Sequence, residues 1–74
     1  MLFNTKKQTV KIEGMMCEHC AKHVKEAVLK IKDVKSCDVN LNKKEAVIKS
    51  KNGIENELLT KAVESVGYKV TEII

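Results

Sequence analysis

The sequence predicts one α+β domain, in which two helices cover one face of a four-stranded sheet. Two observations carry this prediction. Apolar residues alternate with polar ones in four short stretches and recur at helical spacing in two longer ones, which are the patterns of half-buried strands and amphipathic helices. These stretches follow the order strand, helix, strand, strand, helix, strand. With 74 residues and no linker or repeat, residues 1–74 are expected to form a single domain.

The first strand is expected over residues 8–13, where Val10 and Ile12 alternate with polar neighbours and Gly14 follows. A loop comes next. The first helix is expected to begin near Glu18, because apolar residues then recur every three or four positions. The apolar face of this helix consists of Ala21, Val24, Ala27, Val28 and Ile31.

A hairpin is expected after this helix. Its strands are residues 34–41 and 46–48, where apolar and polar residues alternate, and residues 42–44, Asn-Lys-Lys, supply the turn. Cys37 falls within the first of these strands and is interpreted as a small buried hydrophobic residue.

The second helix follows a break at Asn52 and Gly53 and is expected to stop at Gly67, a typical C-terminal cap. Its apolar face consists of Leu58, Leu59, Ala62, Val63 and Val66. The β-branched residues within 68–74 predict a last strand. The complete order is that of the ferredoxin-like βαββαβ sandwich, with a four-stranded antiparallel sheet and two helices on one face.

Charge and composition narrow the class of partner. The net charge is +4, and all the basic residues are lysines. Lysines without arginine or interleaved aromatic residues favour an acidic protein partner over a nucleic acid. No stretch reaches the length of a membrane span, and residues 1–9 lack the apolar run of a signal peptide. We therefore expect a cytoplasmic protein without membrane insertion, whose closely spaced cysteines bind metal or do redox chemistry.

Cys17 and Cys20 lie where the first loop enters the first helix, in the stretch Gly-Met-Met-Cys-Glu-His-Cys. Residues three positions apart are neighbours on a helix surface, so one metal ion can reach both sulfurs. The unpaired amides of a helix N-terminus favour negative charge, which makes thiolates available there.

Three uses of such a pair are open. A thiol oxidoreductase would use it as a redox dithiol, and a closed zinc site would add two further Cys or His ligands. The chain has no proline, which thioredoxin-type folds place opposite their dithiol, and it has no distant second pair of ligands. Two thiolates without further fixed ligands suit a soft ion of low coordination number, above all Cu(I).

The motif and the order of elements resemble the heavy-metal-associated domain family, and within it the bacterial copper chaperones of the CopZ type. The family pattern Gly-Met-x-Cys-x-x-Cys is matched in full by residues 14–20, and the resemblance covers nearly the whole chain. It implies that Cys17 and Cys20 bind Cu(I). It also implies that Met15 turns inward and holds the loop against the core, while Tyr68 lies near the metal.

His19, between the two cysteines, is interpreted as a modulator of thiolate basicity or a partner contact, and His23 as a surface residue. Zinc-exporting relatives carry aspartate immediately before the first cysteine, and Met16 stands there in this chain. The resemblance therefore favours copper, with a domain that handles Zn(II), Cd(II) or Hg(II) as the alternative.

The function implied is that of a copper chaperone, not an enzyme. It would pass Cu(I) by thiolate exchange to the metal-binding domain of a copper-transporting P-type ATPase or to a copper-responsive repressor. Lys22, Lys25 and Lys30 would steer an acidic partner. We expect a monomer without metal, and an exposed two-thiolate site is compatible with a copper-bridged dimer.

Overall fold

The computed structural model describes residues 6–74 and has the predicted βαββαβ order. Its elements are β1 (Lys6–Glu13), α1 (Glu18–Leu29), β2 (Val34–Asn40), β3 (Glu45–Ser50), α2 (Asn56–Ser65) and β4 (Lys69–Ile73). The prediction of a ferredoxin-like sandwich is confirmed. The expectation that the chain begins without a signal peptide falls largely on residues 1–5, outside the described residues.

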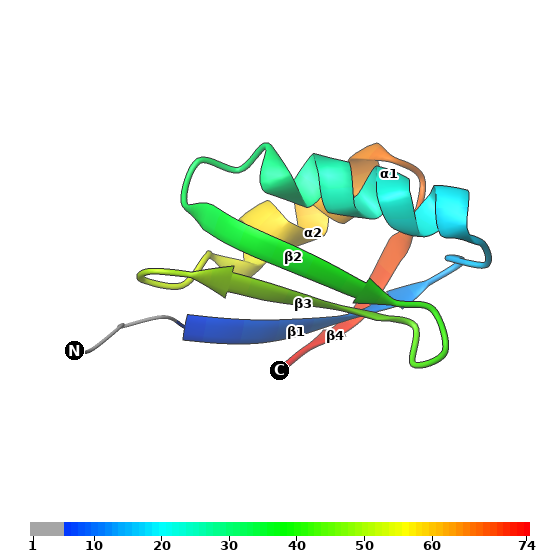
Figure 1. Ribbon diagram of the computed structural model, residues 1–74, viewed down its shortest axis with the longest axis horizontal. Coiled ribbons are helices and arrows are strands. Elements are labelled where there is room, and N and C mark those ends of the chain that lie inside the picture. The colour runs from blue at the N-terminus through cyan, green and yellow to red at the C-terminus, as the bar shows by residue number, and fades with distance from the viewer. Residues whose placement is uncertain (1–5) are drawn as a thin grey trace.

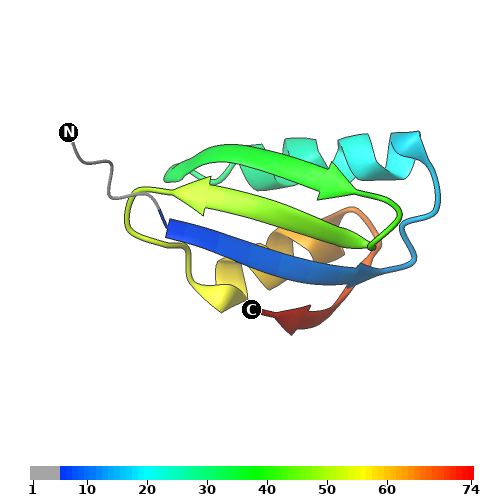
Figure 2. The same cartoon turned by 60° about the horizontal axis from the view of Figure 1, so that its bottom comes forward.

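The four strands form one antiparallel sheet in the order β2, β3, β1, β4. Both helices cover the same face of this sheet (Figure 1), and the other face is open (Figure 2). The loop between β1 and α1, the β2–β3 turn and the start of β4 lie at one end of the molecule. Within residues 6–74, none of the helices has the length and apolar character needed to cross a membrane.

The core lies between the helices and the sheet, and small aliphatic side chains fill it. Its buried members are Val10, Ile12, Met15, Val24, Val28, Cys37, Ala46, Ile48, Ile54, Leu59 and Val63. The strands β1 and β3 each contribute two alternate residues, and each helix contributes two residues four positions apart, as the periodicities predict. The strand β2 contributes Cys37 alone. The expected apolar faces are thus the ones that pack.

Leu58 differs from the expectation, since its side chain is 46% exposed while that of Leu59 is fully buried. Consecutive residues point about 100° apart around a helix, so both cannot face the same core. Leu41 also differs: β2 ends at Asn40, and Leu41 lies in the turn, where it is half-buried. Neither difference changes the order of the elements.

Gly67 ends α2 as predicted and turns the chain toward β4. Its φ of 91° is in the left-handed region, and its N–H donates to the Glu64 carbonyl. The Tyr68 N–H then donates to the Val63 carbonyl. This pair of bonds is the Schellman arrangement that glycine permits after a helix, and it sets the direction in which Tyr68 leaves α2.

Gln8 fixes the chain between β3 and α2. Its side-chain amide donates to the Ile54 carbonyl and its carbonyl accepts from the Ile54 N–H, both at 2.8 Å. Ile54 is buried, and its backbone groups lie outside the sheet ladder, so one side chain pairs groups that would otherwise be costly to bury.

Candidate metal centre

The loop that enters α1 alternates inward and outward side chains. Gly14 has a φ of 97°, a conformation that residues with a Cβ rarely adopt. Met15 follows with 1% of its side chain exposed, and Met16 is 87% exposed. Met15 therefore anchors the loop in the core, in the position expected from the resemblance, while Met16 faces solvent beside the cysteines.

Cys17 and Cys20 stand at the start of α1. Cys17 is the N-cap residue, with extended backbone, and its carbonyl accepts the first helical bond from the Ala21 N–H at 3.0 Å. Cys20 lies in the first turn. The two sulfurs are 3.1 Å apart, with the Cys17 sulfur exposed and Cys20 half-buried. Neither cysteine is in a disulfide, so two soft sulfur donors lie side by side at the surface.

The Cys20 thiol is acidified by its surroundings. Its pKa falls from the ordinary value of 9.0 to about 7, chiefly because the Tyr68 hydroxyl donates a hydrogen bond to it. Interactions with the Cys17 thiol and with the backbone of Met16 also lower this pKa, because hydrogen bonding to the sulfur favours the thiolate. At neutral pH a large share of Cys20 is therefore a thiolate, the form that binds metal.

Tyr68 reaches this site from the far end of the sequence. Its pKa is raised, first by its hydrogen bond to Cys20 and then by burial and the nearby thiols. A Cβ built on Gly14 would lie 3.5 Å from Cδ1 of the Tyr68 ring, which is ordinary contact distance. The ring thus packs on the loop glycine while its hydroxyl faces the sulfur.

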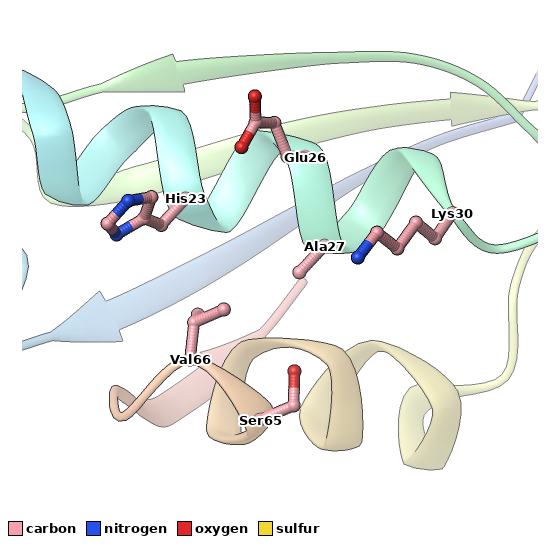
Figure 3. A pocket seen from close by; sticks show the side chains of 6 residues that line it. All are labelled: His23, Glu26, Ala27, Lys30, Ser65 and Val66. Atoms are coloured by element: carbon pink, nitrogen blue, oxygen red, sulfur yellow. The ribbon is translucent and has the colours of Figure 1, made fainter.

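The histidines do not complete a cluster with the cysteines. His19 and His23 are both exposed on α1. In the part of the chain that the structure describes, no three His, Cys, Asp or Glu side chains are placed to share a metal ion. His23 instead lines an open hollow of about 270 Å³ between the two helices, together with Glu26, Ala27, Lys30, Ser65 and Val66 (Figure 3).

Cys37 is separate from this pair. It is 2% exposed in the core, and burial raises the pKa of its thiol to about 11. It is therefore a protonated, small apolar residue at neutral pH, as expected from its place in the strand.

The sequence reasoning missed how closely the site depends on α2. The sequence points to both cysteines and to Tyr68, but it predicts for Gly67 only the role of a helix cap. In the structure the turn at Gly67 is what brings Tyr68 to Cys20. The adjacent pair Gly67-Tyr68 after a helical stripe was the available signal.

Comparison with known proteins identifies relatives of this site. The family model described as HMA, heavy-metal-associated domain, matches residues 9–69. The copper chaperone CopZ of Enterococcus hirae is 34% identical over 68 residues, which cover 90% of this chain and 99% of the chaperone. A mercuric reductase of Shigella flexneri is 43% identical over 63 residues, covering 85% of this chain. The chain spans only 11% of that reductase.

Solved structures of copper-binding proteins have the same fold as this chain. A CopZ metallochaperone superposes with a TM-score of 0.83 at 30% identity, covering 89% of this chain and all of that one. A copper-binding domain of HMA7, a P-type ATPase, superposes with a TM-score of 0.81 at 26% identity and covers 92% of each chain.

Proposed function

Because the chain belongs to the heavy-metal-associated domain family, we propose that it is a copper chaperone, which binds Cu(I) through Cys17 and Cys20 and passes it to another protein. The observation that carries this proposal is the dithiol itself. Two sulfurs lie 3.1 Å apart at the surface, and one of them ionises near neutral pH. Thiolates are the ligands that select soft Cu(I).

The relatives support the choice of metal and of function. The E. hirae relative, which this chain matches over almost its full length, is a copper chaperone. Because the match takes in 99% of that chaperone, a carrier of Cu(I) is the role that this relative supports for the domain. No bond in an organic substrate is made or broken in such a role.

Transfer would proceed by exchange of thiolate ligands. A thiolate of the partner forms a bond to Cu(I), the bond to Cys17 or Cys20 then breaks, and the released sulfur takes up a proton when it returns to the thiol. Copper stays Cu(I) throughout. Exposed Cys17 is the sulfur that an incoming ligand can approach, while half-buried Cys20 keeps its bonds to Tyr68 and the loop.

We infer that the partner is the metal-binding domain of a copper-transporting P-type ATPase, because a domain of that class shares this fold. A copper-responsive repressor is the other candidate recipient. The protein would work in the cytoplasm, where thiols stay reduced. It would be a monomer without metal, and sedimentation with and without Cu(I) would test for a copper-bridged dimer.

Met15, His19 and Tyr68 are proposed to tune the site rather than to bind the metal. Met15 is buried and holds the loop. Tyr68 acts on the basicity of Cys20 through its hydroxyl. His19, exposed between the two cysteines, would act on the partner or on the thiolates.

Competition with a chromophoric Cu(I) chelator under reducing conditions tests the site. We expect the native chain to remove Cu(I) from the chelator and the C17S/C20S variant to lose this ability. The C37V variant is the matched control, because it removes the third thiol and keeps a small apolar side chain in the core. Unchanged Cu(I) affinity in C17S/C20S would show that the metal binds elsewhere.

Hg(II) is the second candidate cargo, because the dithiol suits any soft ion and the matching part of a mercuric reductase is 43% identical. The metal content of protein isolated from cells under reducing conditions distinguishes the two. A Zn(II) or Cd(II) carrier would show an added oxygen or nitrogen ligand in X-ray absorption spectra. A thiol oxidoreductase would instead reduce protein disulfides through a reversible Cys17–Cys20 disulfide.

A further inference from the structure

Charged residues that face one another across the strands are of opposite sign near the metal loop. Lys11 lies opposite Glu45, with which it forms a 2.6 Å ion pair, and it lies opposite Glu72 on its other side. Glu13 lies opposite Lys69. Such cross-strand pairs stabilise a sheet.

One pair at the other end of the sheet breaks this pattern. Lys7 on β1 lies directly opposite Lys49 on β3, and both side chains are exposed. The position opposite Lys49 on β2 is Ser36. The next carboxylate along this face, Asp38, lies opposite Val47 and so only diagonal to Lys49. Like charges directly opposite each other destabilise a sheet, and an anion placed over them would relieve the repulsion.

More lysines surround this pair. We define the distal lysine cluster as Lys6, Lys7, Lys30, Lys32, Lys35, Lys49 and Lys51, all of them exposed. They belong to the start of β1, the end of β3 and the residue after it, the segment that joins α1 to β2, and the start of β2. These parts lie together at the end opposite the metal loop (Figure 1). The acidic residues at this end are Asp33 and those at the start of α2, Glu55 and Glu57.

The helices do not carry the positive charge of the protein. Lys22 and Lys25 on α1, which the sequence suggested as steering residues, are accompanied by Glu18 and Glu26. The helix α2 carries Lys61 with Glu57 and Glu64. The net charge of +4 therefore resides on the sheet and the loops, and much of it lies in the distal lysine cluster.

We propose that the distal lysine cluster docks the protein on a membrane surface that contains anionic lipids. Clustered lysines are attracted to the negative potential of such a surface without any shaped pocket. The cluster is spread over strands and loops at one end of the molecule, and all its side chains are exposed, so it offers a broad charged surface rather than a pocket. It holds neither arginine nor an aromatic residue, the side chains that nucleic-acid sites use for phosphate forks and base stacking.

Docking in this manner would leave the metal centre free. The molecule is 38 Å long, and the loop with Cys17 and Cys20 lies at the opposite end of this axis. A docked protein would therefore hold its thiols away from the lipid and accessible to a protein partner. The proposal goes beyond the proposed function and does not depend on the bound metal.

Co-sedimentation of the full chain with vesicles tests the proposal. The vesicles consist of phosphatidylcholine with phosphatidylserine or of phosphatidylcholine alone, at an ionic strength of about 0.1 M, where charges more than about 10 Å apart are largely screened. We expect binding only to the anionic vesicles. Each lysine near an anionic lipid surface adds favourable binding free energy, so the loss of two in K7Q/K49Q should weaken vesicle binding about tenfold or more.

The matched control is K43Q/K61Q, which removes the same charge from exposed positions outside the cluster and should weaken binding by no more than about twofold. K32Q/K51Q, with both changes in loops, repeats the test should K7Q/K49Q fold poorly. Equal losses in control and cluster variants would overturn the proposal, as would equal binding to both kinds of vesicle. Binding to a single-stranded oligonucleotide that K7Q/K49Q abolishes, without vesicle binding, would assign the cluster to nucleic acid instead.

Discussion

Tyr68, immediately before β4, interacts through its hydroxyl with the Cys20 thiol in the first turn of α1, and this hydrogen-bonding interaction is the largest cause of the lowered pKa of Cys20. This bond favours the thiolate of Cys20 and the neutral form of Tyr68, so it lowers one pKa and raises the other. The reactivity of the metal site is therefore set in part by the residue that precedes the last strand.

Replacement of Tyr68 by phenylalanine should raise the pKa of Cys20 from about 7 toward its ordinary value of 9.0, since the hydroxyl is the largest cause of the shift. The pH profile of Cys20 alkylation by iodoacetamide in the metal-free protein, followed by mass spectrometry, measures this change. The profile of Y68F should move to higher pH. An identical profile in both proteins would mean that the hydroxyl does not act on the sulfur.

The stability of the reduced, metal-free protein should depend on pH through its cysteines. The pKa of Cys20 is lower in the folded state, at about 7 against 9.0. Its contribution is complete above pH 9 and disappears as pH falls through 7, so the free energy of unfolding should rise between these values. The pKa of Cys37 is raised to about 11, so burial of this thiol should cost stability above pH 9. Urea unfolding across this range measures both effects.

Variants separate the two cysteines in this experiment. C37V should remove the alkaline decrease contributed by Cys37 and leave the rise between pH 7 and 9. Y68F should flatten the rise, because its Cys20 has less preference for the thiolate in the folded state. A rise of equal size in Y68F would contradict the assignment to Cys20.

Gln8 offers a test of stability away from the metal site. Its side chain pairs both backbone groups of buried Ile54, so Q8A should lower the free energy of unfolding by about 1–3 kcal/mol. Affinity for Cu(I) should not change. The T71V variant is the control, because its exposed hydroxyl makes one long bond of 3.4 Å and its loss should cost less than about 0.5 kcal/mol. A loss in Q8A no larger than in T71V would count against this role.

The fold can be predicted from local patterns, because apolar residues recur at a regular spacing in each element and recognisable residues mark where it ends. The alternation at Val10 and Ile12 and the stop at Gly67 are encoded within a few residues, and the structure has both. Leu58 is an exception to these patterns. It lies at the edge of the apolar face of α2, where the sequence alone does not distinguish a buried residue from an exposed one. Its exposure depends on how α2 is rotated against the sheet, which no local pattern states.

Only part of the metal site could be predicted from local sequence patterns. The motif placed Cys17 and Cys20 at a helix start, and residue spacing alone brings their sulfurs together. The bond between Tyr68 and Cys20 depends on the packing of α2 and β4 beside the loop, so only the resemblance to a family pointed to it. The like-charged pair of Lys7 and Lys49 requires the register of β1 with β3, which the sequence does not fix without the turn geometry.

Replacement of Gly14 by alanine should damage both the fold and the metal site. Its φ of 97° is strained for any residue with a Cβ, so G14A should lose about 1–2 kcal/mol of stability. The loop relaxes beside the cysteines, so Cu(I) affinity should fall too. The control is G53A, equally strained at a φ of 87° but in the β3–α2 segment, at the other end of the molecule. G53A should lose a similar amount of stability and keep its affinity for Cu(I). If G53A lost as much affinity as G14A, the loss in G14A would come from general destabilisation and not from the metal loop.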